Sequence, residues 1–333
     1  MAMVHLAFSA PPHPFSQWKH GAHLLLKHGA EIDPFQVHKL TEDPDEADLI
    51  LFVEMGEAGF FAERVRAHPY FRRYGRKCFL FDQGDLCYPI LPGVYAGLTE
   101  AHYRADHTRT GFYLVLGENA LIHHAPATGD EKYLASFVGS QNTHAVREQV
   151  FRIQCPDIYL YDTSKNSAQI RYHGTPSERL EFWKHYADSL AGSKFSLCPR
   201  GVAANSIRLY ESMKTGRACI IISDDWHPND GVDWNSFSIR VPESQVHELP
   251  EILKENEDRA VEMGRNARQE WEKWFSEPVR FHHVVELCLE IQRHRGPYSA
   301  VKALEHYRHI PKHPRRYLSS KLNLYRNNKK IYW

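Results

Sequence analysis

Short apolar runs alternate with amphipathic stretches along the first 125 residues. The apolar runs have the length of strands and lack the alternating polar positions of a sheet with one wet face, so they predict strands buried on both faces. The stretches between them carry apolar residues three and four apart, which is the spacing of helices that pack on a core. Strands are predicted at Val4–Phe8, Ala47–Val53 and Lys77–Phe81, and helices over 15–29 and 63–71.

The same alternation repeats after residue 130. Residues 121–130, LIHHAPATGD, are rich in Pro, Gly and small side chains, which predicts a linker between two domains. Gly216 stands where a helix typically ends. Strands are predicted at Leu134–Val138, Ser193–Leu197 and Ala218–Ile222, and helices over 144–152, 177–191, 204–215, 250–275 and 278–293.

Strands that alternate with helices favour parallel sheets, because each helix carries the chain back across the sheet. We therefore predict an α/β fold. At roughly 150 residues per domain, a chain of 333 residues favours two domains. The predicted division is an N-terminal domain at 1–125, a second domain at 131–295, and a C-terminal segment at 296–333.

The balance of charge hides an asymmetry. The chain has 41 Lys and Arg against 41 Asp and Glu. However, no acidic residue follows Glu305, and the segment after it contains eight basic residues interspersed with tyrosines. Without those eight, 33 basic residues face 41 acidic ones. A basic aromatic segment fits an anionic membrane surface and an acidic protein body equally well. Because the basic excess is confined to one end, we expect no nucleic-acid partner.

Composition and motifs exclude several kinds of protein. Hydrophobic residues at 42% and charged residues at 25% are typical of a folded domain. The six cysteines form no CxxC pair, which argues against a zinc ribbon and suits a reducing compartment. P-loop, GxGxxG and GxSxG motifs are absent. The chain shows no signal peptide or membrane-spanning run, and its adjacent histidine pairs lack metal-ligand spacing, so we expect no metal site.

The most informative chemistry lies between Ser193 and Pro242. A predicted strand leads through a Pro-Arg-Gly loop to a helix N-terminus near Asn205 and Ser206, where free N–H groups and the helix dipole favour an anion. Arg208 in the first turn is unfavourable unless an anion is bound nearby. An arginine for a diphosphate and Glu211 for ribose hydroxyls make a nucleotide site. A surface ion pair between Arg208 and Glu211 explains the two residues equally well.

This stretch resembles the exostosin-like glycosyltransferase family. The resemblance rests on SKFSLCPRG, NSIRLYESMKTGRACIIISDD and DWNSFSIRVPE, and it continues upstream in DPDEADLILFV, AHPYFRRYGRKCFLFDQGD and YLASFVGSQNTHAVR. It implies a GT-B fold, in which two Rossmann-like domains face a cleft and the C-terminal one holds a nucleotide-sugar. It also implies an inverting transfer that needs no metal or cofactor, with a UDP-sugar as the favoured donor.

The resemblance implies that Arg200, Gly201, Arg208, Glu211, Ser223 and Asp224 bind the donor. The predicted donor site also includes Asn205 and Ser206 at the helix N-terminus, and Gly139 and Ser140 after the predicted strand 134–138. In the reaction, an acceptor hydroxyl attacks the anomeric carbon while the nucleotide leaves, and a carboxylate or imidazole from the N-terminal domain removes the hydroxyl proton. The candidates for this base are Asp82, Asp85, Glu54 and His13, of which we favour Asp82 or Asp85. Glu54 and Asp82 are also typical caps of turns or helices.

The sequence departs from the animal members of the family in having no membrane anchor and no second catalytic module. We therefore expect a cytoplasmic glycosyltransferase of polysaccharide biosynthesis, peripheral on the inner face of the membrane if its basic segment docks there. Its acceptor would be a growing cell-surface glycan or a lipid-linked saccharide. The alternative from another class is a non-catalytic nucleotide- or glycan-binding protein on the same fold.

Overall fold

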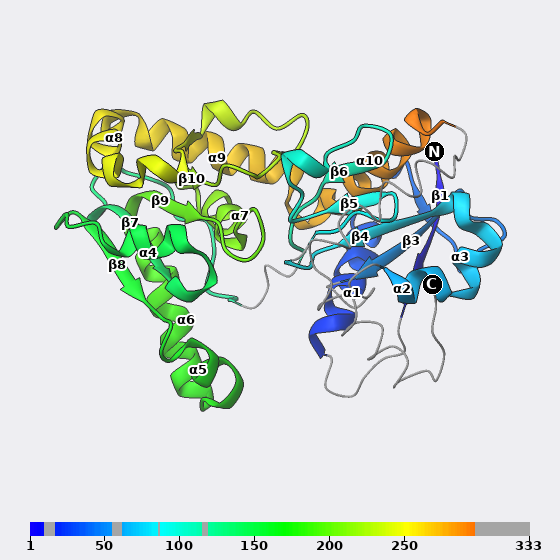
Figure 1. Cartoon of the computed structure of the whole chain (residues 1–333), viewed down its shortest axis with the longest axis horizontal. Coiled ribbons are helices and arrows are strands. Elements are labelled where there is room, and N and C mark those ends of the chain that lie inside the picture. The colour runs from blue at the N-terminus through cyan, green and yellow to red at the C-terminus, as the bar shows by residue number, and fades with distance from the viewer. Residues whose placement is uncertain (10–16, 55–61, 86, 115–118, 297–333) are drawn as a thin grey trace. The chain divides into compact units, whose positions relative to one another are not determined.

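The computed structural model describes residues 1–9, 17–54, 62–85, 87–114 and 119–296 (Figure 1). The chain divides into two compact units, of which unit 1 comprises residues 1–115 and the chain from Glu277 onward, and unit 2 comprises residues 116–276. This division differs from the predicted one, because the last helix belongs to unit 1 rather than to the second domain. The candidate base His13 and the basic C-terminal segment lie outside the described residues.

Unit 1 is built on a six-stranded parallel sheet with the order β2-β1-β3-β4-β5-β6. Every residue of β3 is buried, as expected of a strand with both faces covered. The chain proceeds from β1 toward both edges, so the carboxyl ends of β1 and β3 flank the crevice in which such sheets bind ligands. The strands are β1 (Met3–Ala7), β2 (Lys39–Leu40), β3 (Leu49–Glu54), β4 (Cys78–Asp82), β5 (Gly93–Tyr95) and β6 (Thr108–Thr110).

Helices cover both faces of this sheet. Ile50, Phe52 and Leu80 form a core cluster with side chains of α2 and α3. Helices α1 and α10 contact each other, and α10 also packs on β5 and β6, so the returning end of the chain completes the unit. The helices are α1 (Gln17–Glu31), α2 (Glu63–Ala67), α3 (Pro69–Tyr74) and α10 (Arg280–His294).

Unit 2 is built on a five-stranded parallel sheet with the order β11-β10-β9-β7-β8. The first and third strands of this unit, β7 and β9, are neighbours, so the chain again proceeds outward in both directions from one point. Their carboxyl ends therefore mark the expected ligand crevice of this sheet. The strands are β7 (Tyr133–Gly139), β8 (Ile158–Asp162), β9 (Ser193–Pro199), β10 (Ala218–Ile222) and β11 (Ser238–Arg240).

The helices of unit 2 also lie on both faces. Side chains of α4 and α8 join the core cluster that contains Phe137, Phe195 and Ile220. On the other face, Ser212 of α7 donates to Ser196 Oγ of β9 at 2.7 Å, and Ser136 of β7 donates to a carbonyl of α6 at 3.0 Å. The helices are α4 (Ala145–Phe151), α5 (Ser167–His173), α6 (Pro176–Ala191), α7 (Ile207–Thr215), α8 (Leu249–Glu255) and α9 (Ala260–Trp274).

The α/β prediction is confirmed, since each unit holds a parallel sheet flanked by helices. The long helical region predicted over 250–275 consists of two helices, α8 and α9, which are separated at Asn256. The Asn256 side chain donates to the carbonyl of Ile252 at 2.8 Å, which satisfies a C-terminal carbonyl of α8 and ends the helix. The facing of the two domains across a cleft stays a prediction.

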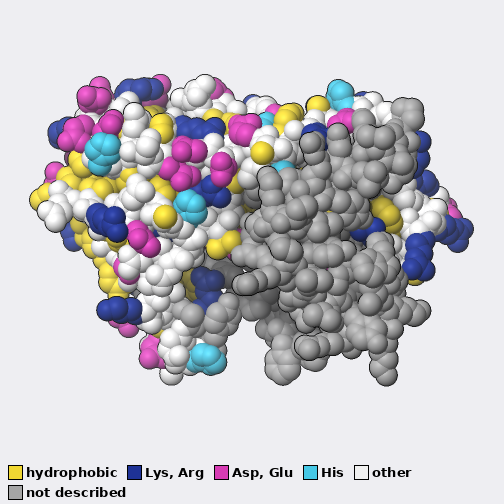
Figure 2. All heavy atoms as spheres, viewed as in Figure 1, with side chains coloured by type: hydrophobic (Ala, Val, Ile, Leu, Met, Phe, Trp, Pro, Cys, Tyr) yellow, Lys and Arg dark blue, Asp and Glu magenta, His cyan; other side chains and the backbone are white. Residues whose placement is uncertain are grey.

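None of the helices within the described ranges has the length and hydropathy needed to cross a membrane. On the face of unit 2 seen in Figure 2, acidic and basic side chains are interspersed with uncharged ones.

Candidate functional site

Arg147 lies between the two chain segments that follow β7 and β9. Its guanidinium donates to the carbonyls of Ser140 at 3.2 Å, Pro199 at 3.2 Å and Arg200 at 2.8 Å, so it joins the segments that follow the two strands. Gly201 lies against this guanidinium, because a Cβ atom at position 201 would stand 3.1 Å from Arg147 Nη2. The absence of a side chain at Gly201 therefore lets the loop approach Arg147 closely.

Arg208, in the first turn of α7, is a buried cation with no carboxylate beside it. It is 3% exposed, and no carboxylate of the described residues lies within ion-pair distance of it. One Nη donates to the carbonyl of Val138, and the guanidinium lies 5.1 Å from the Phe137 ring centroid and 4.5 Å from that of Tyr186. The other Nη is buried without a hydrogen-bond partner among the described residues. Such a buried, unpaired donor is costly, which points to a ligand.

Glu211 lies one turn further along α7 and is 7% exposed. It accepts a short hydrogen bond from the hydroxyl of Tyr186. Burial raises the pKa of Tyr186 well above its usual value, Arg208 opposes that rise and Glu211 adds to it, so the hydroxyl keeps its proton and acts as a donor. An exposed ion pair between Arg208 and Glu211 does not fit these observations, because both residues are buried.

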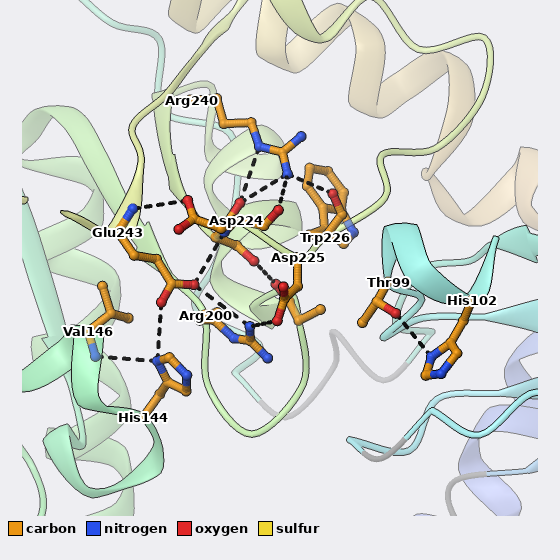
Figure 3. Close-up of polar contacts among 12 residues, drawn as sticks. Thr99, His102, His144, Val146, Arg200, Asp224, Asp225, Trp226, Arg240 and Glu243 are labelled. Atoms are coloured by element: carbon orange, nitrogen blue, oxygen red, sulfur yellow. Dashed lines mark hydrogen bonds and ion pairs between the residues drawn. The ribbon is translucent and has the colours of Figure 1, made fainter. Parts of the chain in front are cut away.

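Arg200 follows β9 and is paired with two carboxylates (Figure 3). Its Nη1 lies 2.5 Å from Asp225 Oδ2 and 3.7 Å from Glu243 Oε1, and 12% of its side chain is exposed. Glu243 in turn approaches His144 Nδ1 at 4.0 Å. Burial lowers the pKa of His144, Arg200 lowers it further and Glu243 opposes the shift, so the imidazole is neutral near pH 7. This leaves its Nδ1 to accept from Val146 N–H at the start of α4.

Two predicted residues at the end of β10 hold the loops of this site in place. Ser223 is 1% exposed and donates to the carbonyl of Ala204 at 2.5 Å, which fixes the loop before α7. Asp224 and Glu243 exchange hydrogen bonds between side chain and backbone N–H at 3.1 and 3.2 Å (Figure 3). Arg240 donates to the carbonyls of Ser223, Asp224 and Trp226 around the same turn.

Buried polar atoms without partners gather at this site. Within the described residues they include Thr143 Oγ1, Arg200 Nε and Arg208 Nη1. A Cβ atom at Gly201 would lie 3.5 Å from Thr143 Oγ1, so this hydroxyl belongs to the same loop contact as Arg147. Asn205 and Ser206 are buried nearby, and the Ser206 side chain makes no capping hydrogen bond at the start of α7. Buried polar groups normally have hydrogen-bond partners, so several buried polar atoms without partners mark a place where a polar ligand fits.

The carboxylates predicted as bases lie at strand ends of unit 1. Glu54 ends β3, is 4% exposed, and accepts from Ser9 N–H at 2.7 Å, so it bridges the ends of β1 and β3. Asp82 stands directly opposite Glu54 in the β3–β4 register, is half-buried, and accepts from Gly84 N–H at 2.8 Å. Asp85 is exposed in the following loop. The turn contact of Asp82 matches the capping alternative, and no observation assigns any of the three a catalytic role.

A pocket of about 520 Å³ lies beside the carboxyl end of β1 in unit 1. Its described lining includes Ser9, whose N–H binds Glu54, and polar aromatic side chains from three elements. Burial lowers the pKa of His68 and nearby His5 lowers it further, so the His68 ring is neutral near pH 7. Imidazole and phenol side chains can exchange hydrogen bonds with hydroxyl groups. The imidazole and phenol side chains that line this pocket are those of His5, His23, His68 and Tyr70.

The predicted donor residues thus lie together at one end of the sheet of unit 2. Three other residues of the same hydrogen-bond and ion-pair network were not predicted. Arg147, Glu243 and Asp225 are part of the same network but were missed. Arg147 carries the signal that identified Arg208, since it is a cation in the first turn of a helix. Glu243 and Asp225 have no local signal, because pairing of β10 with its neighbours brings them to Arg200.

Comparisons with known proteins point to one family. Residues 112–256 match the family model of the Exostosin GT47 domain. The exostosin-1 homolog of Caenorhabditis elegans is 29% identical over 173 residues, which cover 48% of this chain and 45% of that protein. Exostosin-1 of Drosophila melanogaster is 24% identical over 246 residues, or 69% of this chain and 32% of that protein. The chain thus spans less than half the length of these two relatives.

Two solved structures are also similar. The crystal structure of TarM covers 80% of this chain and 57% of its own, with a TM-score of 0.43 and 12% identity. That of MurG from Acinetobacter baumannii covers 86% of this chain and 99% of its own, with a TM-score of 0.36 and 13% identity. All ten predicted donor residues lie within the range that matches the family model. The match over residues 112–256 and the two exostosin relatives support an exostosin-like glycosyltransferase family for this chain.

Proposed function

We propose that the chain is a glycosyltransferase whose unit 2 binds a nucleotide-sugar, with a UDP-sugar as the favoured donor. The observation that carries this proposal is Arg208, a buried guanidinium with no carboxylate and an unpartnered Nη1 at the start of α7. A diphosphate oxygen supplies the missing acceptor and the negative charge together. The family relationship supports the same assignment.

Different groups of this site bind the diphosphate and the ribose of the donor. The N-terminus of α7 and Arg208 face the diphosphate charge, while Glu211, held by the Tyr186 hydroxyl, accepts from ribose hydroxyls. Arg200 is already paired with Asp225, whose side chain is 63% exposed. An incoming phosphate therefore competes with Asp225 for Arg200, and we expect Asp225 to move toward solvent when the donor binds.

The reaction follows from where charge develops. As the acceptor oxygen bonds to the anomeric carbon, the bond to the diphosphate breaks and its electron pair leaves with the nucleotide. Arg200 and Arg208 stabilise this developing charge, which is the role that preorganised cations play in such transfers. A single displacement inverts the anomeric configuration. In this proposal the arginines carry the electrostatic role, so the transfer needs no metal ion.

The acceptor belongs to unit 1 in this proposal. Glu54 and Asp82 lie side by side at the ends of β3 and β4, and one of them removes the proton of the acceptor hydroxyl. The adjacent pocket, with its imidazole and phenol side chains, suits a saccharide. We propose a growing cell-surface glycan or a lipid-linked saccharide as the acceptor, a cytoplasmic location, and a peripheral membrane contact through the basic segment.

Nucleotide binding and sugar transfer test the proposal separately. Calorimetry with UDP and GDP should show UDP binding that Glu211→Gln weakens by about tenfold or more, because a buried acceptor for ribose is lost. Glu148→Gln, an exposed carboxylate on α4, is the matched control and should bind UDP normally. UDP binding that is equal in all three proteins would remove Glu211 from the donor site.

Transfer from labelled UDP-sugars to saccharide acceptors then tests the base. Asp82→Asn or Glu54→Gln should abolish transfer while leaving UDP affinity unchanged. The anomeric configuration of the product reports inversion, and assays in a chelator report the need for a metal. Tight UDP binding without transfer to any saccharide would favour the alternative of a nucleotide-binding protein on the same fold.

A further inference from the structure

Two histidines and a glutamate converge at the edge of unit 1, away from the residues of the proposed reaction. His38 precedes the edge strand β2, and His282 and Glu286 stand one turn apart on α10. One side-chain nitrogen or oxygen from each of the three residues lies within 4.8 Å of the others. We propose that His38, His282 and Glu286 form a binding site for a divalent transition-metal ion such as Zn²⁺.

Three ring nitrogens of this cluster are buried, and none of them has an aligned hydrogen-bond partner among the described residues. The His38 side chain is fully buried, and neither of its ring nitrogens makes a hydrogen bond among the described residues. Nδ1 of His282 is also buried and unpartnered. His38 Nε2 lies 2.9 Å from Glu286 Oε1, which is an ion-pair distance, so the imidazole and the carboxylate already approach one point. Two atoms that approach one another in this way can both direct lone pairs at a shared cation.

The ligand set and its spacing fit a first-row transition metal. Two imidazoles and one carboxylate are the protein ligands of many zinc sites, in which water takes the fourth position. Bonds of about 2.0–2.2 Å place tetrahedral ligand atoms roughly 3.3–3.5 Å apart. The one printed separation, 2.9 Å between His38 Nε2 and Glu286 Oε1, is a few tenths of an ångström shorter than that value, and the ligand atoms of all three residues lie within 4.8 Å of one another, so small side-chain rotations complete the site. The Glu286 side chain is 39% exposed, which leaves a path for the ion and its water.

The surroundings hold the imidazoles in place. The ring of Phe35 stacks on that of His282 with centroids 4.1 Å apart, and the rings of His38 and His282 lie 5.1 Å apart. Arg293 Nη2 lies 3.9 Å from Glu286 Oε2, so it competes with a cation for one oxygen of that carboxylate. A bound ion would join the loop before β2 to α10, the helix that returns to unit 1. The site therefore acts on the stability of unit 1 and not on the transfer reaction.

Metal binding by the full chain tests this site. After treatment with a chelator, the protein should take up one Zn²⁺ in competition with a chromophoric indicator, and its melting temperature should rise with Zn²⁺ concentration. Co²⁺ should give a visible absorption band of a four- or five-coordinate site. Glu286→Gln and His282→Gln should each weaken Zn²⁺ binding by about tenfold or more and remove the Co²⁺ band.

The chain has 22 histidines, so the control must separate this site from surface binding. His294→Gln removes an exposed histidine near the end of the same helix and should leave Zn²⁺ affinity unchanged. Circular dichroism of the metal-free variants shows whether each has folded, and Glu286→Gln, which changes a partly exposed side chain, is the variant least prone to unfold. Equal Zn²⁺ affinity and an equal Co²⁺ band in wild type, Glu286→Gln and His282→Gln would overturn the proposal.

Discussion

Replacing Arg208 with methionine should leave the free protein as stable as before, or more stable, while weakening nucleotide binding. Methionine has a similar length and preserves packing against Phe137 and Tyr186, but it removes a buried charge whose Nη1 has no partner. Relief of an unpaired buried donor is worth about 1–3 kcal/mol, and the loss of the hydrogen bond to the Val138 carbonyl costs about 1 kcal/mol. The free energy of unfolding should therefore change by about 0 to +2 kcal/mol.

Arg217 provides the matched comparison, because its guanidinium is equally buried but hydrogen-bonded to several backbone carbonyls. Its guanidinium donates to four backbone carbonyls and is 2% exposed. Arg217→Met leaves those carbonyls without their donor and should lower the free energy of unfolding by about 3–5 kcal/mol. Urea denaturation, with the slope held constant between proteins, measures both changes.

Calorimetry completes the test of Arg208. One charge-assisted hydrogen bond to a phosphate is worth about 1.5–3 kcal/mol, so Arg208→Met should weaken UDP binding by about 10- to 150-fold. If Arg208→Met destabilises the free protein as much as Arg217→Met does, Arg208 is a structural residue and the reasoning from its unpartnered nitrogen is refuted. Unchanged UDP affinity in a folded Arg208→Met protein would refute it equally.

Three further predictions concern stability. Burial lowers the pKa of His68 and His144 below the usual 6.5, so the unfolded chain binds protons that the folded one rejects. The free energy of unfolding should therefore decrease as the pH falls through 6.5, and His144→Asn, which keeps a helix-capping side chain, should reduce that dependence in urea titrations at pH 7.5 and 5.5. Gly216 ends α7 at φ 87°, so Gly216→Ala should lower stability by about 1–2 kcal/mol. Gly21 lies inside α1 with open space around it, so Gly21→Ala should raise stability by about 0.5–1 kcal/mol, and opposite signs in thermal melts are the check.

The longest apolar runs were predictable because burial on both faces leaves a continuous signal. The predicted strand 218–222 has the observed bounds of β10, and the predicted strand 47–53 differs from β3 by two residues at its start and one at its end. Strands β5 and β6 have three residues each, too few to show any period, and they exist because neighbours pair with them. Local pattern therefore predicts the centre of each sheet better than its edges.

The candidate site shows the same division between local and distant causes. Arg208 and its helix N-terminus could be recognised within a few residues of sequence. Arg147 and Glu243 reach the same point only because β7 and β9 pair and β10 pairs with β9, which depends on contacts roughly 20 to 60 residues apart in the chain. The return of α10 to unit 1 has no local signal, since its apolar face is like that of any packed helix.

That return also sets an order of events during synthesis. Unit 2 is complete once residue 276 has left the ribosome, whereas unit 1 still lacks α10 at that moment. Until then, β5 and β6 and the side of α1 that α10 will cover stay open to solvent. The apolar side chains that later close this surface are Phe281, Val284, Val285, Cys288 and Ile291. Domains that form as units fold as their residues emerge, so the second half of the chain should reach its native state before the first.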